Sequence, residues 1–186
     1  MHFVDLNGDH QITDADRTFI GDPNPKAYGN VFTSLSYKRF RLDANFNYCL
    51  GNDVFNYQRQ QLESGSRFIN QTTAMLQRWQ SEGDQTSMPR VSFQDPMGNS
   101  RFSDRWIEDG SYFRLKTVTL SYTLPVHTSY LQGLEFWVQA NNVFTLTKYL
   151  GSDPEFAVTS SVIGQGIDAG QLPQSRSFVA GVKINL

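Results

Sequence analysis

A short segment near the N-terminus has the residue types and spacing of a calcium-binding loop. Residues 5–16 read DLNGDHQITDAD and place oxygen-bearing groups at positions one, three, five, seven and twelve of an EF-hand loop. Calcium requires about six to eight oxygen ligands, which acidic side chains in a tight loop can supply. The spacing predicts ligands from the side chains of Asp5, Asn7, Asp9 and Asp16 and from the backbone carbonyl of Gln11.

Two positions of this segment depart from the usual calcium loop. His10 stands at position six, where a Gly normally allows a tight turn, and Asp16 stands at position twelve instead of a bidentate Glu. The Asp, which also occurs in dockerin-type loops, predicts lower affinity or altered geometry. The alternative is a turn-forming cluster of Asp, Asn and Gly without a metal. Any ion bound here would be structural and not catalytic.

The other reactive side chains form no recognisable catalytic set. Asp104, Glu108 and Asp109 could be proposed as paired acids for glycoside hydrolysis, which needs two carboxyl groups about 5–9.5 Å apart. Their crowding beside a strand end favours solvated loop charges instead. The histidines lack the spacing of metal ligands, and Cys49 has no basic or histidine neighbour in sequence to activate it. The sequence therefore predicts that the protein is not an enzyme.

Composition excludes several further classes. The chain has 186 residues, of which 18% are charged and 13% aromatic, and its formal net charge is −2. A disordered chain would have few aromatics and a large net charge, and a nucleic-acid-binding protein would have a basic surplus. The single Cys excludes a disulfide scaffold, and no apolar run approaches the roughly 20 residues of a transmembrane helix. Abundant Phe and Tyr among Asn, Ser, Thr and Gly favour amphipathic β-structure.

Five segments alternate between apolar and polar residues with a period of two, which is a strong strand signal. In one of them Leu42, Ala44 and Phe46 share a face. Two segments run to about ten residues or more, the length that a tilted strand needs to cross a bilayer. A soluble sandwich with its apolar face turned inward would alternate in the same way. The segments are about 30–38, 41–50, 112–124, 134–146 and 177–186.

The lengths of the connections favour the membrane barrel over the sandwich. Short links at 38–40 and 125–133 alternate with long ones at 51–111 and 147–176, as in outer-membrane barrels with short periplasmic turns and long extracellular loops. A periplasmic C-terminus then places both long connections, and residues 1–29, outside the cell. Aromatic residues near the strand ends would form interface girdles, although core packing is an alternative. The polar composition of the first long loop predicts one or two short surface helices.

The chain begins without a secretory signal, so it is either not exported or a piece of a longer protein, and the β pattern favours the second. Several stretches, in the right order, resemble the SusC/RagA family of TonB-linked outer-membrane proteins. Residues 3–25 resemble the loop before the last strands of that family, and 105–125 (RWIEDGSYFRLKTVTLSYTLP) its C-terminal segment. Residues 138–155 resemble the penultimate strand with its following GSDPE, and 166–186 the closing loop and strand.

The resemblance implies an all-β fold made of the C-terminal strands of a transporter barrel, in the outer membrane of Bacteroidetes-type bacteria. Such proteins import oligosaccharides or peptides, are capped by a SusD-like surface lipoprotein and are energised by TonB. Plugged transporter barrels have about 22 strands. We therefore expect the plug and the segment that contacts TonB to lie in a missing N-terminal region, and the apolar strand faces to contact outer-membrane lipid.

Two alternative functions stay open at this point. One is a soluble, calcium-stabilised β-sandwich that binds carbohydrate through exposed aromatic residues. The other is a dockerin-like interaction module, although only one calcium repeat is visible. A lone sandwich should be soluble and monomeric, whereas a barrel segment should aggregate through its unpaired edges.

Overall fold

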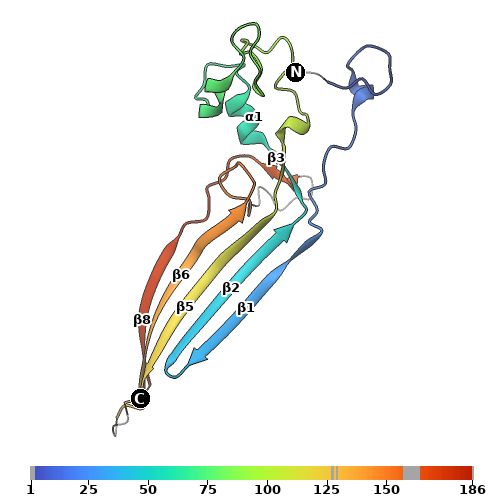
Figure 1. Cartoon of the computed structure of the whole chain (residues 1–186). Coiled ribbons are helices and arrows are strands. Elements are labelled where there is room, and N and C mark those ends of the chain that lie inside the picture. Colours follow the sequence, from blue (N-terminus) through green and yellow to red (C-terminus); the bar gives the residue numbers. More distant parts are fainter. Residues whose placement is uncertain (1–2, 127, 129, 157–163, 186) are drawn as a thin grey trace. The chain divides into compact units, whose positions relative to one another are not determined.

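Figure 1 shows the computed structural model of the chain, which describes residues 3–126, 128, 130–156 and 164–185. The chain divides into two compact units. The loop unit consists of Met1–Pro23, Asp53–Glu108 and Ala157–Gly170. The sheet unit consists of Asn24–Asn52, Asp109–Phe156 and Gln171–Leu186.

The sheet unit contains one five-stranded antiparallel sheet in the order β1-β2-β5-β6-β8 (Figure 1). All but the last of these strands have eleven or more residues, longer than the usual five or six of globular strands. The first strand begins three residues before the expected start, because Ala27 already pairs with Leu50. The strands are β1 (Ala27–Tyr37), β2 (Phe40–Leu50), β5 (Tyr112–Leu124), β6 (Gly133–Thr147) and β8 (Ser177–Asn185).

The register keeps the alternating residues of the strands aligned, so that rows across the sheet are alternately apolar and mainly polar, with Phe32, Trp137 and Val179 as apolar exceptions in the polar rows. Directly paired residues point to the same face, and neighbouring rows point to opposite faces. One row is entirely apolar: Leu35, Leu42, Leu120, Val138 and Ala180. The adjacent row, one residue away along each strand, is polar except on β8: Ser34, Asp43, Thr119, Gln139 and Val179.

The apolar face of this sheet is not covered within its unit. Leu35, Val138 and Ile184 are 62%, 53% and 58% exposed. A soluble sandwich buries such a face against a second sheet about 10 Å away. The exposed apolar face therefore contradicts the sandwich alternative and fits a sheet whose apolar face contacts lipid.

The register of β5 shifts at the end that leads into the loops, against β2 between Asn45 and Phe46 and against β6 between Leu115 and Thr117. Between the pairs Leu115–Phe144 and Thr117–Asn141, β5 and β6 have unequal numbers of residues, which defines a β-bulge. Asn142 takes up the difference with a left-handed φ of 51°, a conformation that Asn tolerates better than most residues.

The loop unit has a small three-stranded sheet in the order β4-β3-β7, in which β3 and β7 run parallel. Its buried apolar side chains are Val54, Met75, Met88 and Trp106. None of the helices in the described ranges is long and apolar enough to cross a membrane. The elements are β3 (Asp53–Asn56), β4 (Ile107–Asp109, whose last residue belongs to the sheet unit), β7 (Ile167–Asp168), helix α1 (Tyr57–Glu63) and the 3-10 helices η1 (Asp14–Asp16), η2 (Thr73–Gln77) and η3 (Asp104–Trp106).

Helix α1 is not the purely surface helix that its polar composition suggested. Gln60 and Glu63 are buried, and both have partners. The Gln60 side-chain amide donates to the Ser100 carbonyl at 2.7 Å, and Glu63 accepts from Arg59 at 3.0 Å and from Thr72 at 2.9 Å. Because every one of these groups finds a hydrogen-bond partner, a polar helix can be buried here without a large desolvation penalty.

Candidate functional site

The polar face of the sheet carries a ladder of uncharged hydrogen-bonding side chains. Thr119 Oγ1 lies 3.3 Å from Gln139 Oε1, and the Gln139 amide donates to Asn141 Oδ1 at 2.9 Å. Asn141 in turn lies within hydrogen-bond distance of Thr117 and donates to Ser177 Oγ at 2.9 Å. The ladder spans β5, β6 and β8 and presents amides and hydroxyls, the groups that hydrogen-bond water, sugars or peptides.

A buried ion cluster lies on the same face, at the end of the sheet where the bulge occurs. Arg114 is 2% exposed and uses three nitrogens. Its Nη2 donates to Asp153 Oδ1 at 2.5 Å, its Nη1 to Glu155 Oε2 at 2.8 Å, and its Nε to Thr145 Oγ1 at 2.8 Å. The planar guanidinium can serve several acceptors at once because its donors point in fixed directions.

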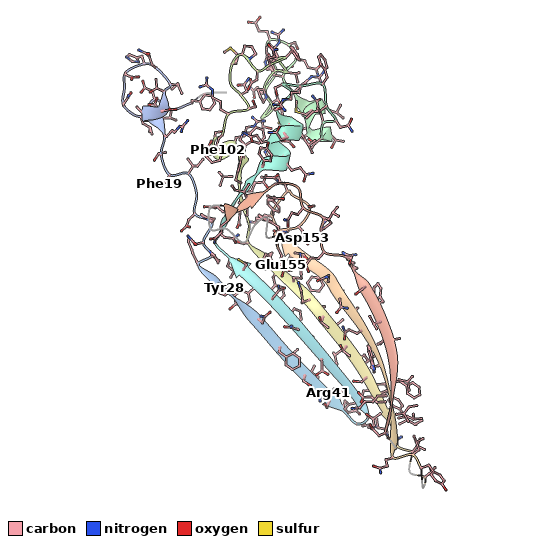
Figure 2. The ribbon with its side chains drawn as sticks, turned by 180° about the vertical axis from the view of Figure 1, so that it is seen from behind. Phe19, Tyr28, Arg41, Phe102, Asp153 and Glu155 are labelled. Atoms are coloured by element: carbon pink, nitrogen blue, oxygen red, sulfur yellow. The ribbon has the colours of Figure 1, made fainter. Side chains whose placement is uncertain are left out.

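A second cation and the neighbouring strand β2 complete this Arg114 cluster. Lys116 Nζ lies 3.0 Å from both carboxylate oxygens of Glu155 and donates to Gln174 Oε1 at 2.6 Å. Asn47 on β2 donates to Glu155 Oε1 at 3.3 Å. The bulge brings both cations of β5 to the polar face, since Lys116 and Arg114 contact the same carboxylate. Figure 2 shows Asp153 and Glu155 at this end of the sheet and Arg41 near the other.

The local sequence GSDPE shapes the loop that supplies the two carboxylates. The residue before a proline is biased to an extended backbone, which suits Asp153. Its Oδ1 accepts the N–H of Glu155 at 2.9 Å and its Oδ2 the N–H of Gln174 at 3.0 Å. Burial alone would raise the pKa of Asp153, but these two hydrogen bonds and Arg114 outweigh it and lower the pKa below its usual value. The carboxylate therefore stays charged.

A polar cavity of about 290 Å³ lies beside the cluster within the sheet unit. Two loop segments, 151–154 and 173–176, form one wall, and the ends of β5 and β6 form the other. Its polar lining includes Arg114, Asn142, Thr145, Asp153, Gln174 and Arg176.

The predicted calcium loop closes on itself through its acidic side chains. Asp5 accepts the N–H groups of Gly8 and His10, each at 2.7 Å. Asp16 accepts those of Leu6 at 2.9 Å and Thr13 at 2.8 Å, which joins the two ends of the segment. These bonds lower the pKa of Asp16, chiefly the one from Thr13. His10 adopts the tight turn that position six requires, with a φ of 63°.

The remaining predicted ligands lie in the same loop. Asn7 Oδ1 accepts the N–H of Asp9 at 3.0 Å, and Asp9 Oδ1 accepts the N–H of Gln11 at 2.8 Å. Across the described part of the chain, no three His, Cys, Asp or Glu side chains are gathered closely enough to form a metal-binding group. An all-oxygen set suits calcium, because carboxylates have lone pairs beyond those used by the backbone. The metal itself stays a prediction.

One of the loop acids differs from its expected solvated state. The Glu108 side chain is only 8% exposed. Its Oε1 lies 2.6 Å from Arg59 Nη1 and accepts a hydrogen bond from the Asn56 side-chain amide at 3.3 Å. Asp109 is exposed, and its pKa is lowered by a side-chain hydrogen bond from Ser111 and by the Ser111 N–H, which it accepts at 2.9 Å. Glu108 thus joins α1 to β4, and the expectation of a solvated charge was wrong at this position.

Comparison with known proteins identifies the class to which this geometry belongs. TonB-dependent receptor P3 of Formosa agariphila is 33% identical over 98% of this chain and 18% of its own length. SusC of Bacteroides thetaiotaomicron, also named a TonB-dependent receptor, is 24% identical over 98% of this chain and 17% of its own length. No protein-family model matches the chain.

Solved structures give the same result. The RagAB peptide importer in its 'closed-closed' state matches with a TM-score of 0.78 and 28% identity, over 94% of this chain and 19% of the matched one. In the 'open-open' state the TM-score is 0.73 over 88% of this chain. The chain thus spans less than a fifth of the proteins that it matches.

The sheet unit is therefore an open segment of a TonB-dependent transporter barrel, and the predicted all-β barrel fold is confirmed. The chain belongs to the SusC/RagA family of TonB-dependent receptors, as its sequence suggested. It is an outer-membrane protein segment and not an enzyme.

The Arg114 cluster was not predicted from the sequence. The available signal was local: Arg114 and Lys116 are the only charged residues in an otherwise neutral strand, and Asp153 and Glu155 flank a proline. Neither pattern indicates that the two cations contact the two carboxylates.

Proposed function

We propose that this chain forms the C-terminal part of the wall of an outer-membrane importer. Its apolar sheet face would contact lipid and its polar face would line the water-filled lumen. The observation that carries this proposal is the row-by-row separation of apolar and polar residues over five aligned strands, with the apolar side exposed. In this orientation the strand ends that lead into the two long connections, 51–111 and 147–176, face the extracellular side.

Accessibility along one strand tests this orientation. Single cysteines at positions 117–122 of the full-length receptor, in a Cys49→Ser background, would carry nitroxide labels in reconstituted membranes. Labels at Val118, Leu120 and Tyr122 should collide with lipid-soluble oxygen, and those at Thr117 and Thr119 with a water-soluble nickel chelate. Equal access of both relaxants along the strand would contradict the barrel orientation.

Oligosaccharides or peptides are the substrate classes that we propose, with uptake driven by TonB. The name of the RagAB structures describes a peptide importer, and SusC is a second relative. The hydroxyl and amide ladder on the polar face can hydrogen-bond either class. Growth of a receptor-deletion strain, with and without the restored full-length gene, on a single glycan or peptide source would identify the class. Growth that never depends on the gene would oppose an import role.

We also propose two further elements of the complete protein. A SusD-like surface lipoprotein would cover the extracellular side, and the TonB complex would contact the N-terminal region that precedes this chain. A calcium ion would stabilise residues 5–16, because the predicted ligands lie in one closed loop whose sixth residue makes the required turn. That ion would stiffen an extracellular loop.

A further inference from the structure

We propose that Arg114 and Lys116 are positioning residues that hold the connection between β6 and β8 inside the barrel lumen. The anchored segment, defined as residues 148–156 and 171–176, would then narrow the passage instead of extending away from the membrane. The orientation of the polar face comes from the proposed function, so this inference rests on it.

The first argument is where the anchored segment reaches. It leaves the sheet at the end of β6, yet Glu155 accepts a hydrogen bond from Asn47 on β2. In the sheet, β5 lies between β2 and β6. The segment therefore crosses two strand spacings over the polar face, about 10 Å. A loop that continued along the strand direction could not make this contact.

The second argument is the charge balance of the contacts. The cluster combines two cations, Arg114 and Lys116, with two carboxylates, Asp153 and Glu155. Arg114 and Asp153 are both buried, and buried charges are tolerated only when they are paired and hydrogen-bonded. Because the two cations and the two carboxylates neutralise one another, these contacts fasten the segment to the strand wall.

The third argument is that both ends of the connection are fastened. Asp153 Oδ2 accepts the Gln174 N–H, and Ser152 Oγ donates to the Gln171 carbonyl at 3.0 Å. The Asn142 amide, at the bulge of β6, donates to the Ser175 carbonyl at 2.9 Å. The outgoing and returning parts of the connection are thus joined to each other and to the strand wall. This makes the anchored segment a rigid flap over the polar face.

A zero-length carbodiimide cross-link in the unmodified full-length receptor tests the position of the flap. An amide bond between Lys116 and Glu155 should form, because their charged groups lie 3.0 Å apart. Glu135 and Lys183 are direct neighbours on β6 and β8 and serve as the internal control. Peptide mass spectrometry showing the 135–183 link without the 116–155 link would overturn the proposal.

Hydrogen exchange of the full-length receptor tests the fastening residues. Arg114→Gln should lower amide protection of residues 148–156 by about a hundredfold, because it leaves Asp153 buried without its cation. Lys116→Gln provides a milder second variant, and Lys116→Arg should retain protection. Arg41→Gln removes an exposed ion pair with Asp43 near the other end of the face and should change nothing in the flap.

If both Gln variants reach normal levels in the outer membrane and residues 148–156 keep their amide protection, Arg114 and Lys116 do not hold the flap. A receptor that imports no substrate while the 116–155 link forms would refute the import role and leave the contact between the flap and β5 established. The two outcomes are therefore distinguishable.

Discussion

The indole of Trp137 occupies the space that a side chain at Gly181 would fill. The two residues face each other directly on β6 and β8, and a Cβ at position 181 would lie 2.5 Å from the indole Cζ2. The pairing explains why a glycine stands within a strand, where it normally weakens the sheet.

Gly181→Ala should therefore destabilise the full-length receptor by about 1–3 kcal/mol, the usual range for overpacking. Gly133→Ala is the matched control, since its Cβ would come no closer than 3.8 Å to the nearest atom, Asn185 Nδ2. Heat-modified mobility on gels gives the midpoint of barrel unfolding for both variants. Equal midpoints would mean that the Trp137 indole can move aside without loss of stability.

Val118→Lys should block assembly of the full-length receptor, because a cation at the bilayer midplane on the lipid face costs about 2–4 kcal/mol. Thr119→Lys, one residue along the same strand, should be tolerated because that position faces the polar side. Surface levels of the two variants, measured by protease shaving of intact cells, separate the faces. Similar levels for both would argue against a lipid-facing Val118.

The flap should resist mild acid. Because its folded pKa is lowered, the Asp153 carboxylate stabilises the folded loop fully above the ordinary Asp pKa of 3.8, and this stabilisation is lost as pH falls through the folded value. Exchange protection of residues 148–156, corrected for intrinsic rates, should stay constant from about pH 8 to about pH 5 and fall only below pH 3.8. Asp153→Asn should show lower protection throughout and a smaller fall, because Glu155 is then the remaining carboxylate of the cluster.

Asp5→Ala combined with Asp9→Ala should abolish calcium binding, because both remove predicted carboxylate ligands. Asp14→Asn is the control, since Asp14 lies outside the ligand spacing and pairs with Arg17 on the surface. Elemental analysis of purified full-length receptor, with terbium luminescence as a second probe, gives the occupancy. Unchanged calcium content in the double variant would eliminate the assigned site.

Trp106→Ala should loosen the loop unit, because the side chain is 1% exposed and its Nε1 donates to the Arg101 carbonyl at 3.0 Å. Losing a buried Trp typically costs about 3–5 kcal/mol. Leu76→Ala, at a position 72% exposed, should have little effect. Protease cleavage within residues 51–111 of the full-length receptor should increase only in the first variant, and equal cleavage would exclude Trp106 as a core residue.

The long strands could be predicted because their information is local. Alternation in a stretch such as 112–124 depends only on neighbouring residues, and the register then follows from matching the apolar faces. The turn at His10 also depends on nearby residues, since its hydrogen bonds close within residues 5–16, while calcium binding there stays a prediction.

The parts that depend on distant partners could not be predicted. Arg114 binds Asp153 across 39 positions, and Arg59 binds Glu108 across 49. Glu108 was therefore expected to be solvated, and the sheet formed by β3, β4 and β7 went unnoticed because strands of two to four residues have no measurable period. The residues that flank a side chain do not indicate a partner that comes from another loop.

The bulge near Lys116 has a consequence for biogenesis. Sliding β5 by a single residue against its neighbours would invert every side chain and aim the guanidinium of Arg114 at hydrocarbon. Only one alignment gives both cations a hydrated, counter-charged destination. A strand inserted with that slip would lose these charge contacts, so we expect the bulge to disfavour mispaired strands during assembly.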